Sequence, residues 1–181
     1  DLITFSKKKN YRKGEAMGLN FQGLSNQVKG DFPKALYYYN RSLIINEEIG
    51  SKNEILKVIN NMGSINAYLG NNPKALKCYN RTLIIAKEIE DKLLIAGTLA
   101  NIGAIYNGQE NYPKALEYNM RALTIAKEIE DKQLIPSILG NIGSIYEKQG
   151  NYSKALEHFN RSIKLSEKFG LNQQIAANLN G

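Results

Sequence analysis

Apolar residues recur along most of the chain with the 3.6-residue rhythm of an α-helix. In one kind of segment they form a single narrow stripe at i, i+4, i+7 and i+11, as in the set Ile95, Leu99, Ile102 and Tyr106. In a second kind, alanines and larger aliphatic residues form a broader apolar face, as around Ala115, Ala122 and Ala126. We call these segments helix A and helix B. Each has one apolar face, so each is expected to bury that face against a neighbour.

The two kinds of segment alternate in an internal repeat with a period of 40 residues. The segments GDFPKALYYYNRSL, GNNPKALKCYNRTL, ENYPKALEYNMRAL and GNYSKALEHFNRSI begin at Gly30, Gly70, Glu110 and Gly150, without insertion or deletion between them. Helix pairs at a fixed period are typical of a solenoid, in which each hairpin packs on its neighbours. The sequence therefore predicts an all-α solenoid of antiparallel helix hairpins, forming a single array over residues 1–181.

The period also places the repeats. Four repeats are expected at about 12–50, 51–90, 91–130 and 131–169. Residues 1–10 match the tail of a preceding helix B, and residues 171–181 match the start of a further helix A. Neither end carries the polar cap that closes a solenoid, so we expect a fragment of a longer array whose exposed ends can support homo-oligomers.

The expected helix starts carry local signals. Helix B should begin at a capping residue whose side-chain oxygen accepts a hydrogen bond from a free amide, and the four candidates are Asp31, Asn71, Asn111 and Asn151. Proline follows in the first turn at Pro33, Pro73 and Pro113, where it is tolerated. Pro136 lies near the start of a helix A and is expected to delay or kink that helix.

One glycine per period lies within helix A, where glycine costs about 1 kcal/mol relative to alanine. These are Gly23, Gly63, Gly103 and Gly143, and an alanine follows each of them twelve residues later at Ala35, Ala75, Ala115 and Ala155. Small residues permit close approach where helices A and B cross, so we expect packing across the hairpin to offset the propensity cost.

The set Gly103, Tyr106, Ala115 and Ala122 resembles the small-and-aromatic signature of the tetratricopeptide repeat, whose usual period is about 34 residues. The chain is similar to the 40-residue variant of spindle-orientation scaffolds and bacterial sensor and regulator proteins. This resemblance implies a right-handed superhelix in which helix A lines a concave, peptide-binding groove. The sequence departs from the pattern at Asn26 and Asn66, which replace the ring of Tyr106, and at Asn119, which replaces the ring of Tyr39.

A row of asparagines, Asn61, Asn101 and Asn141, lies off the buried stripe. At 100° per residue, Asn101 is about 120° from the centre of the stripe. Helices pack about 8–10 Å apart and an extended peptide rises about 3.3 Å per residue, so one asparagine could meet every third ligand residue. An amide can pair with both polar groups of a peptide bond. We therefore predict a peptide-binding site in which this row is joined by Lys57, Asn60, Tyr68, Asn107 and Lys148.

Two alternatives stay open on this face. The asparagines could instead hydrogen-bond between neighbouring helices and fix how repeats stack. In the first repeat the corresponding positions are apolar, namely Met17, Phe21, Leu24 and Val28. This row is either a pocket for an apolar ligand anchor or a surface covered by a missing preceding repeat, and the sequence alone favours the second.

Composition narrows the chemistry. The net charge is +7, but the only dense basic cluster is Lys7–Lys13, and acids and bases alternate elsewhere, so we expect no nucleic-acid partner. No run approaches the roughly 18 apolar residues of a membrane span, and the N-terminus has no signal-peptide core, so no membrane role is expected for this fragment. Cys78 and His158 are each the single residue of their type. No catalytic constellation, metal site or cofactor motif is found, so we predict that the chain is not an enzyme and needs no cofactor.

The function predicted is a protein-protein interaction module that binds a peptide segment or partner protein in its groove. The alternative is a self-assembly or signal-transmission module within a larger bacterial sensor or regulatory protein, attached to a kinase, cyclase or DNA-binding domain. A cytoplasmic location is favoured over a periplasmic one.

Overall fold

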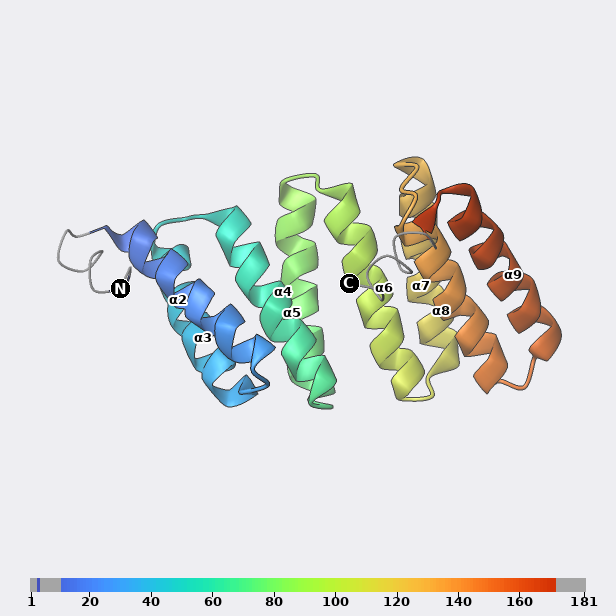
Figure 1. Cartoon of the computed structure of the whole chain (residues 1–181), viewed down its shortest axis with the longest axis horizontal. Helices are drawn as coiled ribbons and strands as arrows, with labels where there is room; N and C mark the ends of the chain where they lie inside the picture. Colours follow the sequence, from blue (N-terminus) through green and yellow to red (C-terminus); the bar gives the residue numbers. More distant parts are fainter. Residues whose placement is uncertain (1–2, 4–10, 172–181) are drawn as a thin grey trace. The chain divides into compact units, whose positions relative to one another are not determined.

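A computed structural model describes Ile3 and residues 11–171. The described chain is folded into α-helices joined by short turns, and its helices are drawn in sequence order in Figure 1. Their bounds are α2 Arg12–Val28, α3 Phe32–Glu48, α4 Lys52–Tyr68, α5 Asn72–Glu88, α6 Lys92–Gly108, α7 Tyr112–Glu128, α8 Leu134–Lys148 and α9 Tyr152–Lys168. The predicted all-α fold of alternating A and B helices is confirmed. The predicted partial helices at the two ends lie outside the described residues, apart from Ile3.

The chain forms two compact units, residues 1–85 and residues 86–181, with the boundary inside α5. In unit 1, helix α3 packs on both α2 and α4. In unit 2, helix α7 packs on both α6 and α8, α8 packs on α9, and α6 also contacts α8 directly. Each unit therefore contains A helices (α2 and α4, or α6 and α8) held together through a B helix.

The capping residues act as predicted at three B helices. Side-chain oxygens of Asp31, Asn111 and Asn151 accept hydrogen bonds from the backbone amides three residues later, at 3.2, 3.3 and 3.2 Å. Pro136 has the expected effect, because α8 begins at Leu134, whereas the corresponding helices α4 and α6 begin at Lys52 and Lys92. The turn before α8 is stabilised instead by Asp131. Its carboxylate accepts hydrogen bonds from the backbone amides of Gln133 and Leu134, at 2.9 and 2.7 Å.

The core of unit 1 shows how neighbouring hairpins meet. Val58 and Ile65 of α4 are buried against Ala35 and Tyr39 of α3, and Met62 packs on the same cluster. The face of helix A that carries positions 58, 62 and 65 is therefore the face that receives the preceding helix B.

The glycines of helix A lie against large side chains. A Cβ atom at Gly23 would come within 2.5 Å of the Tyr39 ring, one at Gly63 within 2.8 Å of the Tyr79 ring, and one at Gly143 within 2.7 Å of the Phe159 ring. We expected a contact between small residues, with the alanine twelve positions later. The nearest side chain at these three glycines is instead the ring sixteen positions later. A Cβ atom at Gly103 would lie against Asn119 and 3.2 Å from the backbone oxygen of Ala115.

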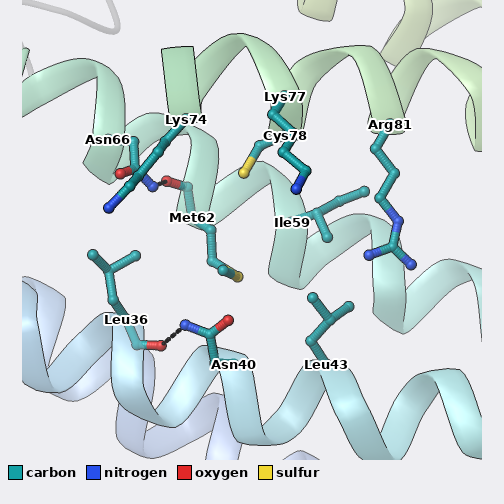
Figure 2. Close-up of a pocket in the computed structure, with 10 residues that line it drawn as sticks. All are labelled: Leu36, Asn40, Leu43, Ile59, Met62, Asn66, Lys74, Lys77, Cys78 and Arg81. Atoms are coloured by element: carbon teal, nitrogen blue, oxygen red, sulfur yellow. Dashed lines mark hydrogen bonds between the residues drawn. The ribbon is translucent and has the colours of Figure 1, made fainter. Parts of the chain in front are cut away.

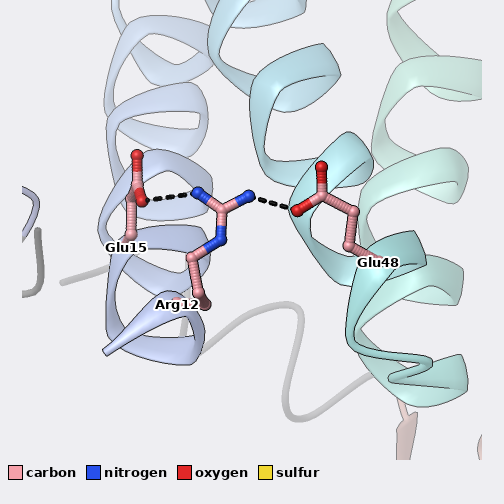
Figure 3. A network of polar contacts seen from close by, with 3 residues as sticks. All are labelled: Arg12, Glu15 and Glu48. Atoms are coloured by element: carbon pink, nitrogen blue, oxygen red, sulfur yellow. Dashed lines mark hydrogen bonds and ion pairs between the residues drawn. The ribbon is translucent and has the colours of Figure 1, made fainter. Parts of the chain in front are cut away.

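Polar contacts tie helix ends together on the surface. In unit 1, the Arg12 guanidinium bridges Glu15 of its own helix, at 3.2 Å, and Glu48 at the end of α3 (Figure 3). Its hydrogen bond to Glu48 is the main cause that raises the pKa of Arg12. In unit 2, Lys92 at the start of α6 pairs with Glu128 at the end of α7, at 3.3 Å. The Arg12–Glu48 and Lys92–Glu128 pairs are exposed, so each contributes little to stability, whereas the Glu15 side chain is buried.

Candidate functional site

Each A helix has a side that is turned away from the core. We call the positions 17, 21, 24 and 28 of α2, and their counterparts at every 40 residues, the A-face. In α8 these positions are Ser137, Asn141, Ser144 and Lys148, which are exposed or half-buried, while Ile138, Leu139, Ile142 and Ile145 are buried. The predicted asparagine positions therefore lie off the buried stripe, as expected.

The A-face of unit 2 presents two asparagine side chains, those of Asn101 and Asn141. Asn101 of α6 is exposed and Asn141 of α8 is half-buried. Within the described part of the chain, neither side chain makes a hydrogen bond. Because α6 contacts α8 directly, the two residues lie on neighbouring helices.

The A-face of unit 1 uses its asparagine differently. Asn61 is half-buried, and its Nδ2 donates to the hydroxyl of Tyr39, at 3.3 Å. The same hydroxyl donates to Oε1 of Gln27 at 2.7 Å, so Tyr39 links α2, α3 and α4. For Asn61 the structure thus shows the alternative role, a hydrogen bond between neighbouring helices.

The remaining unit 1 residues of the predicted site lie close to Asn61 in sequence and have local partners. Lys57 pairs with Glu54 at 2.7 Å. The carbonyl of Asn60 accepts from the Ser64 hydroxyl at 3.1 Å. Tyr68 is 77% exposed and its ring lies 5.1 Å from that of Phe32.

Unit 2 lacks the hydroxyl that makes this link in unit 1. The counterparts of Tyr39, Gln27 and Asn61 are Asn119, Asn107 and Asn141. Asn119 is fully buried and its Nδ2 donates to the Ala115 carbonyl at 2.8 Å, but its Oδ1 accepts no hydrogen bond from a described residue. Oδ1 of Asn107 is likewise buried without a partner in the described chain. Buried acceptors of this kind are costly unless a donor reaches them. Lys148, the last predicted site residue, is exposed at the end of α8.

The first A helix carries an apolar row on its A-face. Met17, Phe21 and Val28 are 55%, 66% and 81% exposed, and Leu24 is exposed as well. A contiguous row of large exposed apolar side chains marks an interaction site more often than a scattered single residue does.

Both explanations of this row stay predictions. Asn61 of α4, the counterpart of Phe21, is half-buried and bonded to Tyr39 of the preceding hairpin, so a preceding hairpin reaches part of the A-face. The preceding helix B also packs on the positions of Val58, Met62 and Ile65, which in α2 are Gly18, Gln22 and Ser25.

Stacked rings fill a further position in unit 2. Tyr106 stacks on Tyr118, with ring centroids 5.5 Å apart, and Tyr146 stacks on His158 at 5.6 Å. The ammonium of Lys114 lies 5.1 Å from the centre of the Tyr106 ring, and that of Lys154 lies 5.1 Å from the centre of the Tyr146 ring. Tyr118 thus occupies the stacking position, and the buried ring position next to it is left to Asn119.

His158 is a structural residue in this arrangement. Burial lowers its pKa from the ordinary value, because the charged imidazolium is disfavoured there; nearby Arg161 and Lys154 act in the same direction and Glu157 opposes them. In the described part of the chain, no three His, Cys, Asp or Glu residues are grouped so that they could hold a metal ion.

The lowered pKa predicts a pH effect on stability. The unfolded chain takes up a proton at His158 near pH 6.5, before the folded chain does, so the free energy of unfolding should fall as the pH drops below that value. Tyrosine stacks in the same place in the preceding repeat, so His158→Tyr should remove this component. Urea unfolding of both proteins between pH 7 and 5 measures it. The fall should be steeper for the parent chain, and equal slopes would contradict the assignment.

Comparisons with known proteins place the fold. The tetratricopeptide repeat model matches residues 54–128 and 94–168, which together make up more than half of the chain. No curated protein matches the sequence. No helix in the described part of the chain is long and apolar enough to cross a membrane.

Three solved structures with a similar fold are each less than 25% identical to the chain. BtubC from P. vanneervenii has a TM-score of 0.79 and 19% identity over 88% of this chain. Aspartyl phosphate phosphatase F from Bacillus subtilis has a TM-score of 0.81 and 22% identity over 88% of this chain. NprR in complex with its cognate peptide NprX has a TM-score of 0.70 and 22% identity over 88% of this chain. The chain spans 66%, 42% and 48% of these three proteins, respectively. With its repeated helix hairpins and the family match, the chain belongs to the tetratricopeptide repeat family.

Proposed function

We propose that the A-face binds an extended peptide segment of a partner protein. The observation that carries the proposal is the pair Asn101 and Asn141, whose amides stand open on adjacent helices of unit 2 without a partner in the described chain. Each amide can pair with the donor and the acceptor of one peptide bond, so the contact does not depend on the ligand's side chains.

The energetics require more contacts than these two. A hydrogen bond contributes about 0.5–1.5 kcal/mol net, whereas micromolar affinity corresponds to about 8 kcal/mol. In unit 2, Asn107 and Lys148 are the proposed additional contacts. In unit 1, the proposed contacts are Lys57, Asn60, Asn61 and Tyr68, and the exposed row Met17, Phe21, Leu24 and Val28 adds apolar area for a ligand side chain.

The family and one structural neighbour support a binding role rather than catalysis. NprR was crystallised with a cognate peptide, and it shares this fold at a TM-score of 0.70. Residues of both charges alternate along the described helices, and this supports a protein partner over a nucleic acid. The proposal therefore assigns the chain to adaptor-type modules that hold a peptide.

A selected peptide provides the probe for a test. Panning a random peptide library against the chain yields binders, and titration calorimetry gives their affinity. The double variant Asn101→Ala/Asn141→Ala should weaken the best peptide by tenfold or more, because up to four hydrogen bonds are lost. The matched control is Asn160→Ala, an exposed asparagine of helix α9, which should bind as the parent chain does.

The same variants address the alternative function, a self-assembly or signal-transmission module. Unchanged peptide affinity in the double variant, together with a shifted monomer-dimer equilibrium in sedimentation, would replace the proposed role with assembly. Circular dichroism of each variant checks that the fold is kept.

A further inference from the structure

Unit 1 contains a pocket away from the A-face, between helices α3, α4 and α5 (Figure 2). Its volume is ≈ 440 Å³. Apolar side chains line it from α3 and α4, among them Leu36, Ile59 and Met62, and Figure 2 shows Met62 reaching into the space. Three cations of α5 lie at its edge, namely Lys74, Lys77 and Arg81. Among the described residues, no carboxylate lines the pocket.

Two of the pocket-lining positions hold small side chains where unit 2 has aromatic rings. The pairs Tyr106–Tyr118 and Tyr146–His158 fill the corresponding place in unit 2. In unit 1 the counterparts are Asn66 and Cys78, which both line the pocket. Asn66 is folded back onto its own helix, where its Nδ2 donates to the Met62 carbonyl at 2.7 Å. Two small side chains thus stand where a stacked aromatic pair stands elsewhere.

The charge around the pocket is changed at the same place. Glu117 and Glu157 pair with the arginine four residues later, at 3.4 and 3.6 Å. Their counterpart in α5 is Lys77, so the carboxylate next to Arg81 is replaced by a second cation. Arg81 pairs instead with Glu47.

Lys74 is altered by the same substitutions. Its counterparts Lys114 and Lys154 lie over the rings of Tyr106 and Tyr146, at 5.1 Å. In unit 1 that ring is Asn66, so Lys74 lacks the aromatic surface that its counterparts cover. The pocket therefore combines three features. It has space for a ring, it has a cation placed to cover that ring, and it carries added positive charge.

We propose that this pocket binds a small planar aromatic anion. The ring takes the place of the missing pair, against Met62 and Leu36, and its negative charge faces Lys74 and Lys77. Pockets of about 300–1,000 Å³ with apolar walls and a few polar groups are typical of small-molecule sites. Burial raises the pKa of the Cys78 thiol, which keeps that side chain neutral and leaves the positive charge unopposed from within the pocket. The site lies off the A-face, so it is independent of the peptide proposal.

The probe for the test is 2-naphthoate, with neutral 2-naphthalenemethanol and the non-aromatic anion octanoate as comparisons. Titration followed by ¹⁵N-resolved NMR should show saturable binding of 2-naphthoate, with shifts concentrated at residues of α3, α4 and α5 around Met62. Both comparison molecules should bind at least fivefold more weakly. Absence of saturable shifts at millimolar naphthoate would overturn the proposal.

Filling the pocket from within tests its location. The double variant Asn66→Tyr/Cys78→Tyr rebuilds the ring pair that unit 2 contains at Tyr106 and Tyr118, so it should fold and lose naphthoate binding by tenfold or more. If the two rings do not fit together, the single variants Asn66→Tyr and Cys78→Tyr are tested in place of the double variant. Binding that is unchanged in folded variants would contradict the assigned pocket.

Charge is tested with one reversal and one control. Lys77→Glu restores the carboxylate found at Glu117 and should weaken naphthoate about tenfold. Lys87→Glu changes the net charge equally on the same helix but away from the pocket, so it should have little effect. Equal weakening by both variants would show that only the overall charge matters and would overturn the site.

Discussion

Gly23→Leu is expected to lower the free energy of unfolding by about 2 kcal/mol, although leucine is the better helix former. The new Cβ would lie 2.5 Å from the ring of Tyr39. That ring cannot move aside easily, because it is fully buried and its hydroxyl is tied to Gln27 and Asn61. Overpacking costs about 1–3 kcal/mol or more, and this outweighs a propensity gain of about 1 kcal/mol.

Urea unfolding followed by circular dichroism measures the effect. Gly97→Leu is the matched control in another A helix, since nothing lies within 4 Å of its Cβ position. The control should be neutral or slightly stabilising. If Gly23→Leu were as stable as the parent chain, the close contact with the ring would not govern the choice of glycine.

Tyr39→Ala is expected to destabilise the chain by about 3–5 kcal/mol, the usual cost of removing a buried aromatic side chain. Beyond the ring, the substitution removes the hydroxyl that links α2, α3 and α4 and leaves Gln27 and Asn61 without that partner. Tyr39→Phe separates the two components: it keeps the ring and should cost about 1–2 kcal/mol for the lost hydrogen bonds.

The contact between the two residues can be measured directly. In the double variant Gly23→Leu/Tyr39→Ala, the leucine has the space that the ring vacated. The stability loss of the double variant should therefore be smaller than the sum of the two single-variant losses by about 1 kcal/mol or more. Strict additivity would contradict a direct contact. A loss in Tyr39→Phe as large as in Tyr39→Ala would place the whole effect in the hydroxyl.

Periodicity was sufficient to predict the helices. The 40-residue period, the N-cap residues and Pro136 are local signals, and each acts on the residues beside it in the chain. The late start of α8 at Leu134 follows from one proline. The two compact units are not visible in such signals, because the repeat continues through α5 without any change in spacing.

Contacts between helices were harder to predict. The sequence showed a glycine and an alanine at fixed positions, and it suggested that they meet. The structure places the ring of Tyr39 on Gly23, because the longer side chain reaches across from the next turn of the B helix. The length of the Tyr39 side chain also explains the hydrogen bond of Asn61. The angle between Asn61 and the buried stripe could be counted from the sequence, but the bond depends on how far the Tyr39 hydroxyl reaches between the helices.

The sequence thus predicted which helix face carries the candidate site, but not which hydrogen bonds its residues make. Asn101 is exposed and Asn141 is half-buried, both off the buried stripe as the helical angles indicated, and the explanation of the apolar row of α2 stays a prediction. The buried acceptor of Asn119 had a visible sequence signal, the asparagine in place of a ring, although its consequence depends on which neighbours the ring would have reached.

The central proposal, that the A-face binds a peptide backbone, is tested most directly by locating the bound peptide. The measurement is NMR mapping of the selected peptide on the isotope-labelled chain, with the side-chain amides of Asn101 and Asn141 assigned. These two amides should shift on saturation, with intermolecular contacts along α6 and α8. Contacts confined to the B helices α7 and α9, with both amides unmoved, would contradict it.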